Sequence, residues 1–124
     1  MVGKITKGSN PWTEHYSAVM AEVPDADDPD TQLNRAFIAT LAQADQVYIV
    51  GEAGSHCVKA TTEHIADSFG PQAVAKLVLL TDCMSPVAGF DAQYQAFLRD
   101  MQARGAQLAQ SGDVLQELLR NAGR

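Results

Sequence analysis

Cys57 is the residue of this sequence best placed to do chemistry, because of the segment that surrounds it. In VYIVGEAGSHCVKAT, residues 47–61, an apolar run is followed by a loop of small residues, and Cys57 then stands where a helix would begin. The positive end of a helix dipole favours the thiolate, which is the nucleophilic form of cysteine. The unpaired N–H groups of a helix N-terminus also bind an oxyanion. The pattern therefore predicts an activated cysteine nucleophile.

Three other residues near this segment carry reactive or titratable side chains, and the sequence leaves their roles open. His56 could act as a general base in a Cys–His pair, or it could structure the loop. Asp82 follows the next apolar run, where it could cap a turn or contact a substrate. A disulfide between Cys57 and Cys83 could form if both line one cleft.

Apolar runs and helical spacing predict the elements that position these residues. The runs Val47–Val50, Leu77–Leu80 and Ala106–Ala109 are predicted strands, and Lys4–Lys7 is predicted to be the end of another. Helices are predicted where apolar residues recur with helical spacing or follow a capping residue. The first predicted helix contains Leu33, Phe37, Leu41 and Ala44, with Thr31 as its N-cap. The others are Val58–Phe69, Ala92–Arg104, and a helix that starts at Ser111 or Asp113 and runs through Leu119.

Strands that alternate with helices at this spacing predict a three-layer α/β fold, in which a parallel sheet has helices on both faces. In such sheets, binding sites form at the carboxyl ends of the strands. Lys7 ends one predicted strand, and Cys57 and the part Thr81–Pro86 of the predicted loop Thr81–Gly89 follow two others, so the topology places them on the same side of the sheet, though not necessarily together. A length of 124 residues is that of a single domain.

Composition argues against several classes of partner and location. The net charge is -6 and no cluster of Lys or Arg occurs, which argues against binding to nucleic acid or to an anionic membrane. No apolar run approaches the ~18 residues of a membrane span, and the N-terminus lacks the apolar core of a signal peptide. The chain is therefore expected to be cytoplasmic, with its two cysteines as free thiols.

Two segments of the sequence resemble one enzyme family. GEAGSHCVKAT, preceded by VYIV and followed by KLVLLTDCMSPVAGF, resembles the isochorismatase-like cysteine hydrolases, and among them most closely the nicotinamidases. KITKGSNPWTEHYSA resembles the region that carries the catalytic lysine of that group. The resemblance covers nearly the whole chain. It implies a Rossmann-like sheet with its helices and a cis peptide bond between Glu52 and Ala53.

The resemblance also implies roles for individual residues. Cys57 would be the nucleophile, which attacks an amide carbonyl, releases ammonia and leaves a thioester for water to hydrolyse. Lys7 would stabilise the thiolate and the developing negative charge, and the backbone N–H groups of Ala53 and Cys57 would form the oxyanion hole. The implied substrate is nicotinamide or a similar small amide, whose ring Trp12 and Tyr16 would wall.

Part of the family fold is absent from this sequence. The family has a catalytic Asp and a metal site of Asp and His residues, which lie in an N-terminal half that has no counterpart here. The resemblance therefore implies that residues 1–124 are one incomplete hydrolase domain, with N-terminal strands missing. No cofactor is expected within the chain, and a divalent, zinc-like metal is expected in the missing part. If the chain is active alone, a carboxylate such as Glu14, Glu52 or Asp82 must replace the absent Asp.

Other functions stay open at the level of sequence. In the family's strand order, the missing strands would leave Val47–Val50 at an exposed apolar edge. A second hypothesis is therefore a catalytically inactive, truncated α/β module that acts through self-association or partner binding, as a homo-oligomer or with the missing N-terminal half. A third is a redox-responsive protein that uses Cys57 and Cys83. Vinyl-ether hydrolysis of the isochorismatase type needs no cysteine nucleophile, so the Cys57 loop favours amide chemistry.

Overall fold

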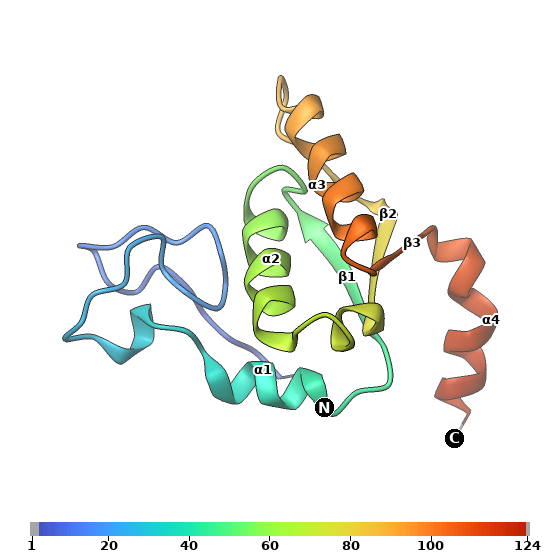
Figure 1. Cartoon of the computed structure of the whole chain (residues 1–124), viewed down its shortest axis with the longest axis horizontal. Coiled ribbons are helices and arrows are strands. Elements are labelled where there is room, and N and C mark those ends of the chain that lie inside the picture. Colours follow the sequence, from blue (N-terminus) through green and yellow to red (C-terminus); the bar gives the residue numbers. More distant parts are fainter. Residues whose placement is uncertain (1–2, 124) are drawn as a thin grey trace.

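The computed structural model describes residues 3–123 and shows an α/β fold (Figure 1). The α-helices are α1 (Arg35–Ala42), α2 (Cys57–Phe69), α3 (Asp91–Ala103) and α4 (Ser111–Ala122). The strands are β1 (Val47–Glu52), β2 (Leu77–Ser85) and β3 (Gln107–Ala109), and short 3-10 helices occupy Pro29–Thr31 and Ala73–Lys76. Among residues 3–123, no helix has both the length and the apolar character needed to cross a membrane.

The strands form one parallel sheet in the order β1-β2-β3. β2 is the central strand, and its apolar run Leu77–Leu80 is buried throughout, as expected where both faces of a parallel sheet are covered. The ladder between β1 and β2 shifts its register between Ile49 and Gly51, and it ends where Glu52 pairs with Ser85. No strand in the described residues pairs with the outer side of β1, which is therefore an edge strand.

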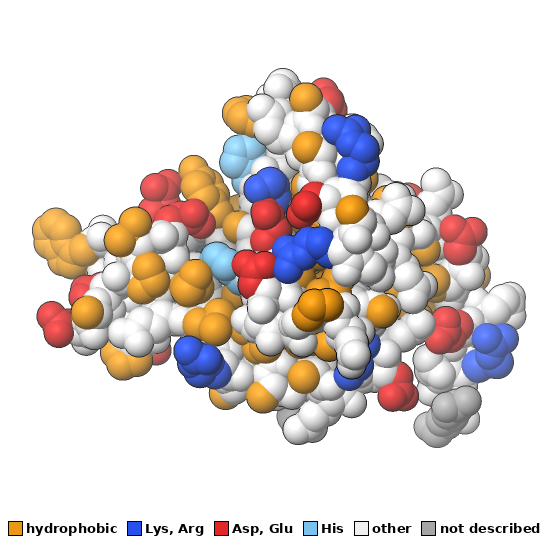
Figure 2. Space-filling view, in the orientation of Figure 1, with side chains coloured by type: hydrophobic (Ala, Val, Ile, Leu, Met, Phe, Trp, Pro, Cys, Tyr) orange, Lys and Arg blue, Asp and Glu red, His pale blue; other side chains and the backbone are white. Residues whose placement is uncertain are grey.

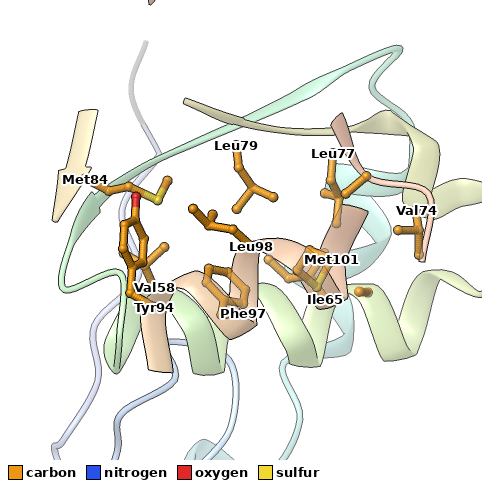
Figure 3. Close-up of a cluster of buried hydrophobic side chains, with 12 residues drawn as sticks. Val58, Ile65, Val74, Leu77, Leu79, Met84, Tyr94, Phe97, Leu98 and Met101 are labelled. Atoms are coloured by element: carbon orange, nitrogen blue, oxygen red, sulfur yellow. The ribbon is translucent and has the colours of Figure 1, made fainter. Parts of the chain in front are cut away.

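Helices cover both faces of the sheet, as predicted (Figure 1). α2 and α3 lie on one face, and α4 lies on the other, where it contacts β2. The hydrophobic core lies between the sheet and the helices α2 and α3. Its buried side chains include Ile65, Leu77, Leu79, Phe97 and Met101 (Figure 3). Burial of each such side chain contributes roughly 1.5–3 kcal/mol. This core holds the carboxyl end of β1 against the N-terminus of α2.

The predicted helices and strands from β1 to α4 are confirmed, with shifts at their ends. Two other predictions, one of a strand and one of a loop, are wrong. Lys4–Lys7 is not a strand, because no strand in the described residues lies beside it to form a ladder. Thr81–Gly89 is not a loop throughout, because β2 continues to Ser85. The extension follows from pairing, since the end of β1 supplies a partner for the last residues of β2.

The predicted N-cap of α1 is also wrong. Thr31 is fully buried, and its hydroxyl bonds to the backbone of Asp25 and Asp28 instead of starting a helix. Asn34 takes the capping role, since its side-chain oxygen accepts a hydrogen bond from the N–H of Phe37 at 3.1 Å. The helix therefore begins later in the chain than the cap at Thr31 predicts.

Asp82 anchors the first turn of α4 to β2. One carboxylate oxygen accepts a hydrogen bond from the N–H of Ser111 at 2.8 Å, and the other accepts one from its hydroxyl at 2.6 Å. These two bonds hold the pKa of Asp82 below its usual value. Among the roles that the sequence leaves open for Asp82, the structure shows the capping one.

A pH-dependent part of the stability should therefore come from Asp82. Because its pKa is lowered in the folded protein, this stability is complete above the unfolded-state pKa of about 3.9 and is lost as the pH falls through the lower folded-state value. We expect Asp82→Asn to destabilise the protein at pH 7 and to lose less further stability on acidification than the wild type. Urea unfolding of both proteins at neutral and acid pH measures this, and equal losses would contradict it.

Candidate active site

A tight turn between β1 and α2 positions Cys57. The carbonyl of Ala53 accepts a hydrogen bond from the N–H of His56 at 3.0 Å, and the N–H of Gly54 donates to the carbonyl of Ser85 at 2.7 Å. The turn is thus tied both to itself and to β2. Cys57 is the first residue of α2, where backbone N–H groups lack partners in a preceding helical turn.

Two backbone features lie where β1 ends and this turn begins. The peptide bond between Glu52 and Ala53 is cis, as the resemblance implies. Gly51 has a φ of 124°, a conformation that residues with side chains rarely adopt, so glycine permits the change of register at the end of β1. The oxyanion hole assigned to the N–H groups of Ala53 and Cys57 stays a prediction.

Lys7 contacts the sulfur of Cys57 although 50 residues separate them in the chain. Its Nζ lies 3.2 Å from Sγ of Cys57 and donates to the carbonyl oxygens of Tyr16 at 2.7 Å and His15 at 3.3 Å. The two carbonyls fix the ammonium in place beside the sulfur. A cation so close to a thiol favours the thiolate. The two residues with predicted catalytic roles are therefore brought together.

The Lys–Cys pair lies in a cleft of about 270 Å³. The cleft is bounded by the outer side of β1, the start of α2 and the N-terminal segment, and its lining residues are Lys7, Tyr16, Ala18, Ile49, Val50, Gly51, Glu52, Cys57, Val58 and Thr61. Most of these side chains are apolar, with a few polar groups near the sulfur. Such a lining is typical of a site for a small organic molecule.

The two aromatic residues predicted to contact a substrate differ in position. Tyr16 lines the cleft, and the Glu14 carboxylate, with a smaller contribution from burial, raises the pKa of its phenol. Trp12 does not line the cleft and is 90% exposed. Trp12 and Val23 are the most exposed of the large hydrophobic side chains. Figure 2 shows that hydrophobic side chains are scattered among charged and other polar ones on this face of the molecule.

His56 packs within the turn and does not line the cleft. Its ring lies 5.8 Å from that of Tyr16 and 4.6 Å from that of Phe90, with the latter pair edge to face. Its Nδ1 is 2.8 Å from the hydroxyl of Ser55. These contacts favour the loop-structuring role for His56 over that of a general base for Cys57.

The two cysteines are both free thiols, so the structure contains no disulfide between them. Cys83 lies near the end of β2, where burial and then the neighbouring Asp82 carboxylate raise the pKa of its thiol. A raised pKa keeps the thiol protonated and makes it a poor nucleophile. Cys57 is therefore the better candidate for nucleophilic chemistry.

Thr61 is a site residue that the sequence analysis did not identify. Its hydroxyl donates to the carbonyl of Cys57 at 2.8 Å and accepts from the N–H of Ala18 at 2.9 Å. It thereby joins the start of α2 to the segment that carries Lys7. Its position four residues after Cys57, on the same face of the helix, is the signal that points to it.

The residues that the structure describes do not offer a metal site. Within residues 3–123, no group of three or more His, Cys, Asp or Glu side chains is arranged to hold a metal ion. A zinc-like ion needs about four such ligands in a closed site and three in an open one. These residues therefore do not fit the metal that the resemblance implies. Its placement in an N-terminal part of the family fold stays a prediction.

A parallel α/β sheet with a Lys–Cys cleft beside its edge strand places this chain in the α/β isochorismatase-like fold. A nicotinamidase pyrazinamidase of Acinetobacter baumanii matches it with a TM-score of 0.54 and 22% identity, over 82% of this chain and 44% of that one. The yeast nicotinamidase Pnc1p matches with a TM-score of 0.50 and 20% identity, over 78% of this chain and 40% of that one.

At these identities the likeness establishes the fold, and the chain spans less than half the length of either neighbour. No protein-family model and no curated protein matches the sequence. The chain is thus similar in fold to these two nicotinamidases.

Proposed function

We propose that this protein is a cysteine hydrolase of the nicotinamidase type, which converts nicotinamide or a similar small amide to the acid and ammonia. The observation that supports this most is the contact of Lys7 Nζ with Cys57 Sγ at 3.2 Å, inside a mostly apolar cleft. The fold shared with two nicotinamidases adds support.

The proposed mechanism follows from the arrangement of these groups. The thiolate of Cys57, stabilised by the fixed ammonium of Lys7, attacks the amide carbonyl carbon. The N–H groups of Ala53 and Cys57 are proposed to hold the oxygen as it gains negative charge. The nitrogen gains a proton as the carbon–nitrogen bond breaks and leaves as ammonia, and water then hydrolyses the thioester. Tyr16 is the proposed aromatic contact for a substrate ring, and Trp12 lies outside the cleft.

The proposal concerns the protein together with any polypeptide that completes its fold. Because the chain spans less than half of each structural neighbour, we propose that a second copy or an N-terminal half adds to it. The divalent, zinc-like metal is proposed to belong to that additional part. Every step above is assigned to residues of this chain alone.

Replacing Cys57 tests the proposed function directly. We expect Cys57→Ala to lower kcat for ammonia release from nicotinamide by about 10³-fold or more, because Cys57 is the one thiol among the described residues that line the cleft. Cys83→Ala is the matched control and should retain activity, since that thiol is held protonated. Ammonia release can be followed by a coupled assay on the purified chain. Turnover that survives in Cys57→Ala would refute the nucleophile.

A second candidate function is favoured by the edge of the sheet. β1 has no partner on its outer side among the described residues, and Val50 on it is 54% exposed. An apolar edge strand of this kind pairs readily with another chain. A wild-type chain that releases no ammonia would favour this alternative, a catalytically inactive module that acts through self-association or partner binding.

A further inference from the structure

Lys7 is fully occupied as a hydrogen-bond donor. A lysine ammonium has three N–H donors and no acceptor. Lys7 uses them on two carbonyl oxygens and on Cys57 Sγ, so it can stabilise a thiolate but cannot take up the thiol proton. A thioester mechanism therefore needs a second group, which accepts that proton and returns it to the departing nitrogen.

Glu52 is the one carboxylate among the described residues that line the cleft. It stands at the end of β1 and pairs with Ser85 in the ladder. The hydroxyl of Ser85 lies 2.9 and 2.8 Å from the two carboxylate oxygens, so the carboxylate is anchored at the end of the strand. The side chain is otherwise exposed, which gives water access to it.

Other titratable groups near Cys57 are less suitable. The ring of His56 packs between Tyr16 and Phe90 and does not line the cleft. Tyr16 does line it, but the Glu14 carboxylate raises the pKa of the phenol, so Tyr16 keeps its proton at neutral pH. Glu14 itself is not part of the cleft lining.

We propose that Glu52 is the acid–base catalyst of the Cys57–Lys7 site, an inference that rests on the proposed hydrolase function. Its carboxylate first accepts the Sγ proton, which leaves the thiolate that the Lys7 ammonium stabilises. The thiolate then attacks the carbonyl carbon, and the π pair of the carbonyl moves to oxygen as the carbon–sulfur bond forms. The electron pair on the oxygen then re-forms the carbonyl, and the carbon–nitrogen bond breaks. The proton passes from Glu52 to the nitrogen, which leaves as ammonia.

The second half of the reaction uses the same carboxylate. Water adds to the thioester carbon and gives one proton to Glu52. The carbon–sulfur bond then breaks, and that proton returns to the sulfur of Cys57. One amide and one water have become one acid and one ammonia, and both residues end in their starting state.

The test is Glu52→Gln, with Glu117→Gln on α4 as matched control, in a Cys83→Ala background so that only Cys57 reacts with iodoacetamide. We expect Glu52→Gln to lower kcat for nicotinamide by roughly 100-fold or more. It should also speed alkylation of Cys57 at neutral pH several-fold, because a negative charge in the same cleft disfavours the thiolate. Glu52→Asp should recover part of kcat, and Glu117→Gln should change neither readout.

The two readouts separate this inference from the proposed function. An unchanged kcat or an unchanged alkylation rate in Glu52→Gln overturns the role of Glu52. A loss of both together indicates a merely structural role and also overturns it. If the wild type releases no ammonia, the proposed function fails, and the alkylation rate alone decides whether Glu52 is coupled to Cys57.

Discussion

Replacing Lys7 with glutamine is expected to lower kcat/KM for ammonia release by about 100-fold and to slow the alkylation of Cys57 at neutral pH. The substitution removes the cation that lies 3.2 Å from the sulfur while keeping a side chain of similar length. A hydrogen bond to a charged group contributes about 1.5–3 kcal/mol, which corresponds to roughly 10- to 150-fold in rate. The initial rate of ammonia release and the second-order rate constant with iodoacetamide measure the two effects.

Two further variants show whether position and charge both matter at Lys7. Lys4→Gln removes an exposed lysine of the same segment and should leave both rates unchanged. Lys7→Arg keeps the charge, but a planar guanidinium cannot direct its donors as an ammonium does, so we expect only partial activity. An alkylation rate that Lys7→Gln does not change would show that the ammonium does not activate the thiol.

Replacing Gly54 with alanine is expected to destabilise the protein by about 1–3 kcal/mol and to reduce activity strongly. A Cβ atom at Gly54 would lie 2.5 Å from Cε1 and 2.7 Å from Cδ1 of Tyr94, closer than such atoms can approach. Tyr94 is buried in the core beside Val58 and Met84, so its ring has little room to move away (Figure 3). The turn must shift instead, and Cys57 shifts with it.

The destabilisation should be specific to the contact with Tyr94. Urea unfolding measures the free energy of unfolding, and Gly112→Ala is the matched control because nothing lies within 4 Å of a Cβ built there. Gly112 is in α4, where alanine should be neutral or slightly stabilising. In Gly54→Ala with Tyr94→Ala, we expect less destabilisation than the sum of the single variants. Wild-type stability for Gly54→Ala would contradict the predicted clash.

Much of the fold could be predicted from sequence because the signals for β1, α2 and α3 are local. A short apolar run bounded by turn residues favours a strand, and apolar residues at helical spacing favour a helix, wherever they occur. The extent of β2 could not be predicted in this way. Its continuation through Ser85 depends on pairing with the end of β1, and pairing between distant segments leaves no local pattern.

The same distinction applies to the candidate site. Cys57 could be predicted because a strand, a turn and a helix start are contiguous around it. Its pairing with Lys7 rested on the resemblance to a family, since no periodicity links residues 50 positions apart. Trp12 and Tyr16 belong to an irregular segment, where spacing does not reveal which side chains share a face. Only Tyr16 of these two lines the cleft.

In the proposed hydrolase, the hydroxyl of Thr61 would make activity depend on a local opening equilibrium. It links the N–H of Ala18 to the carbonyl of Cys57. The segment that precedes Ala18 and carries Lys7 pairs with no strand in the described residues. Segments held by few hydrogen bonds open at a lower free-energy cost than the core does. Turnover by the proposed hydrolase would then scale with the fraction of molecules in which the segment is closed, and about 1.4 kcal/mol in the opening free energy would change that fraction up to tenfold.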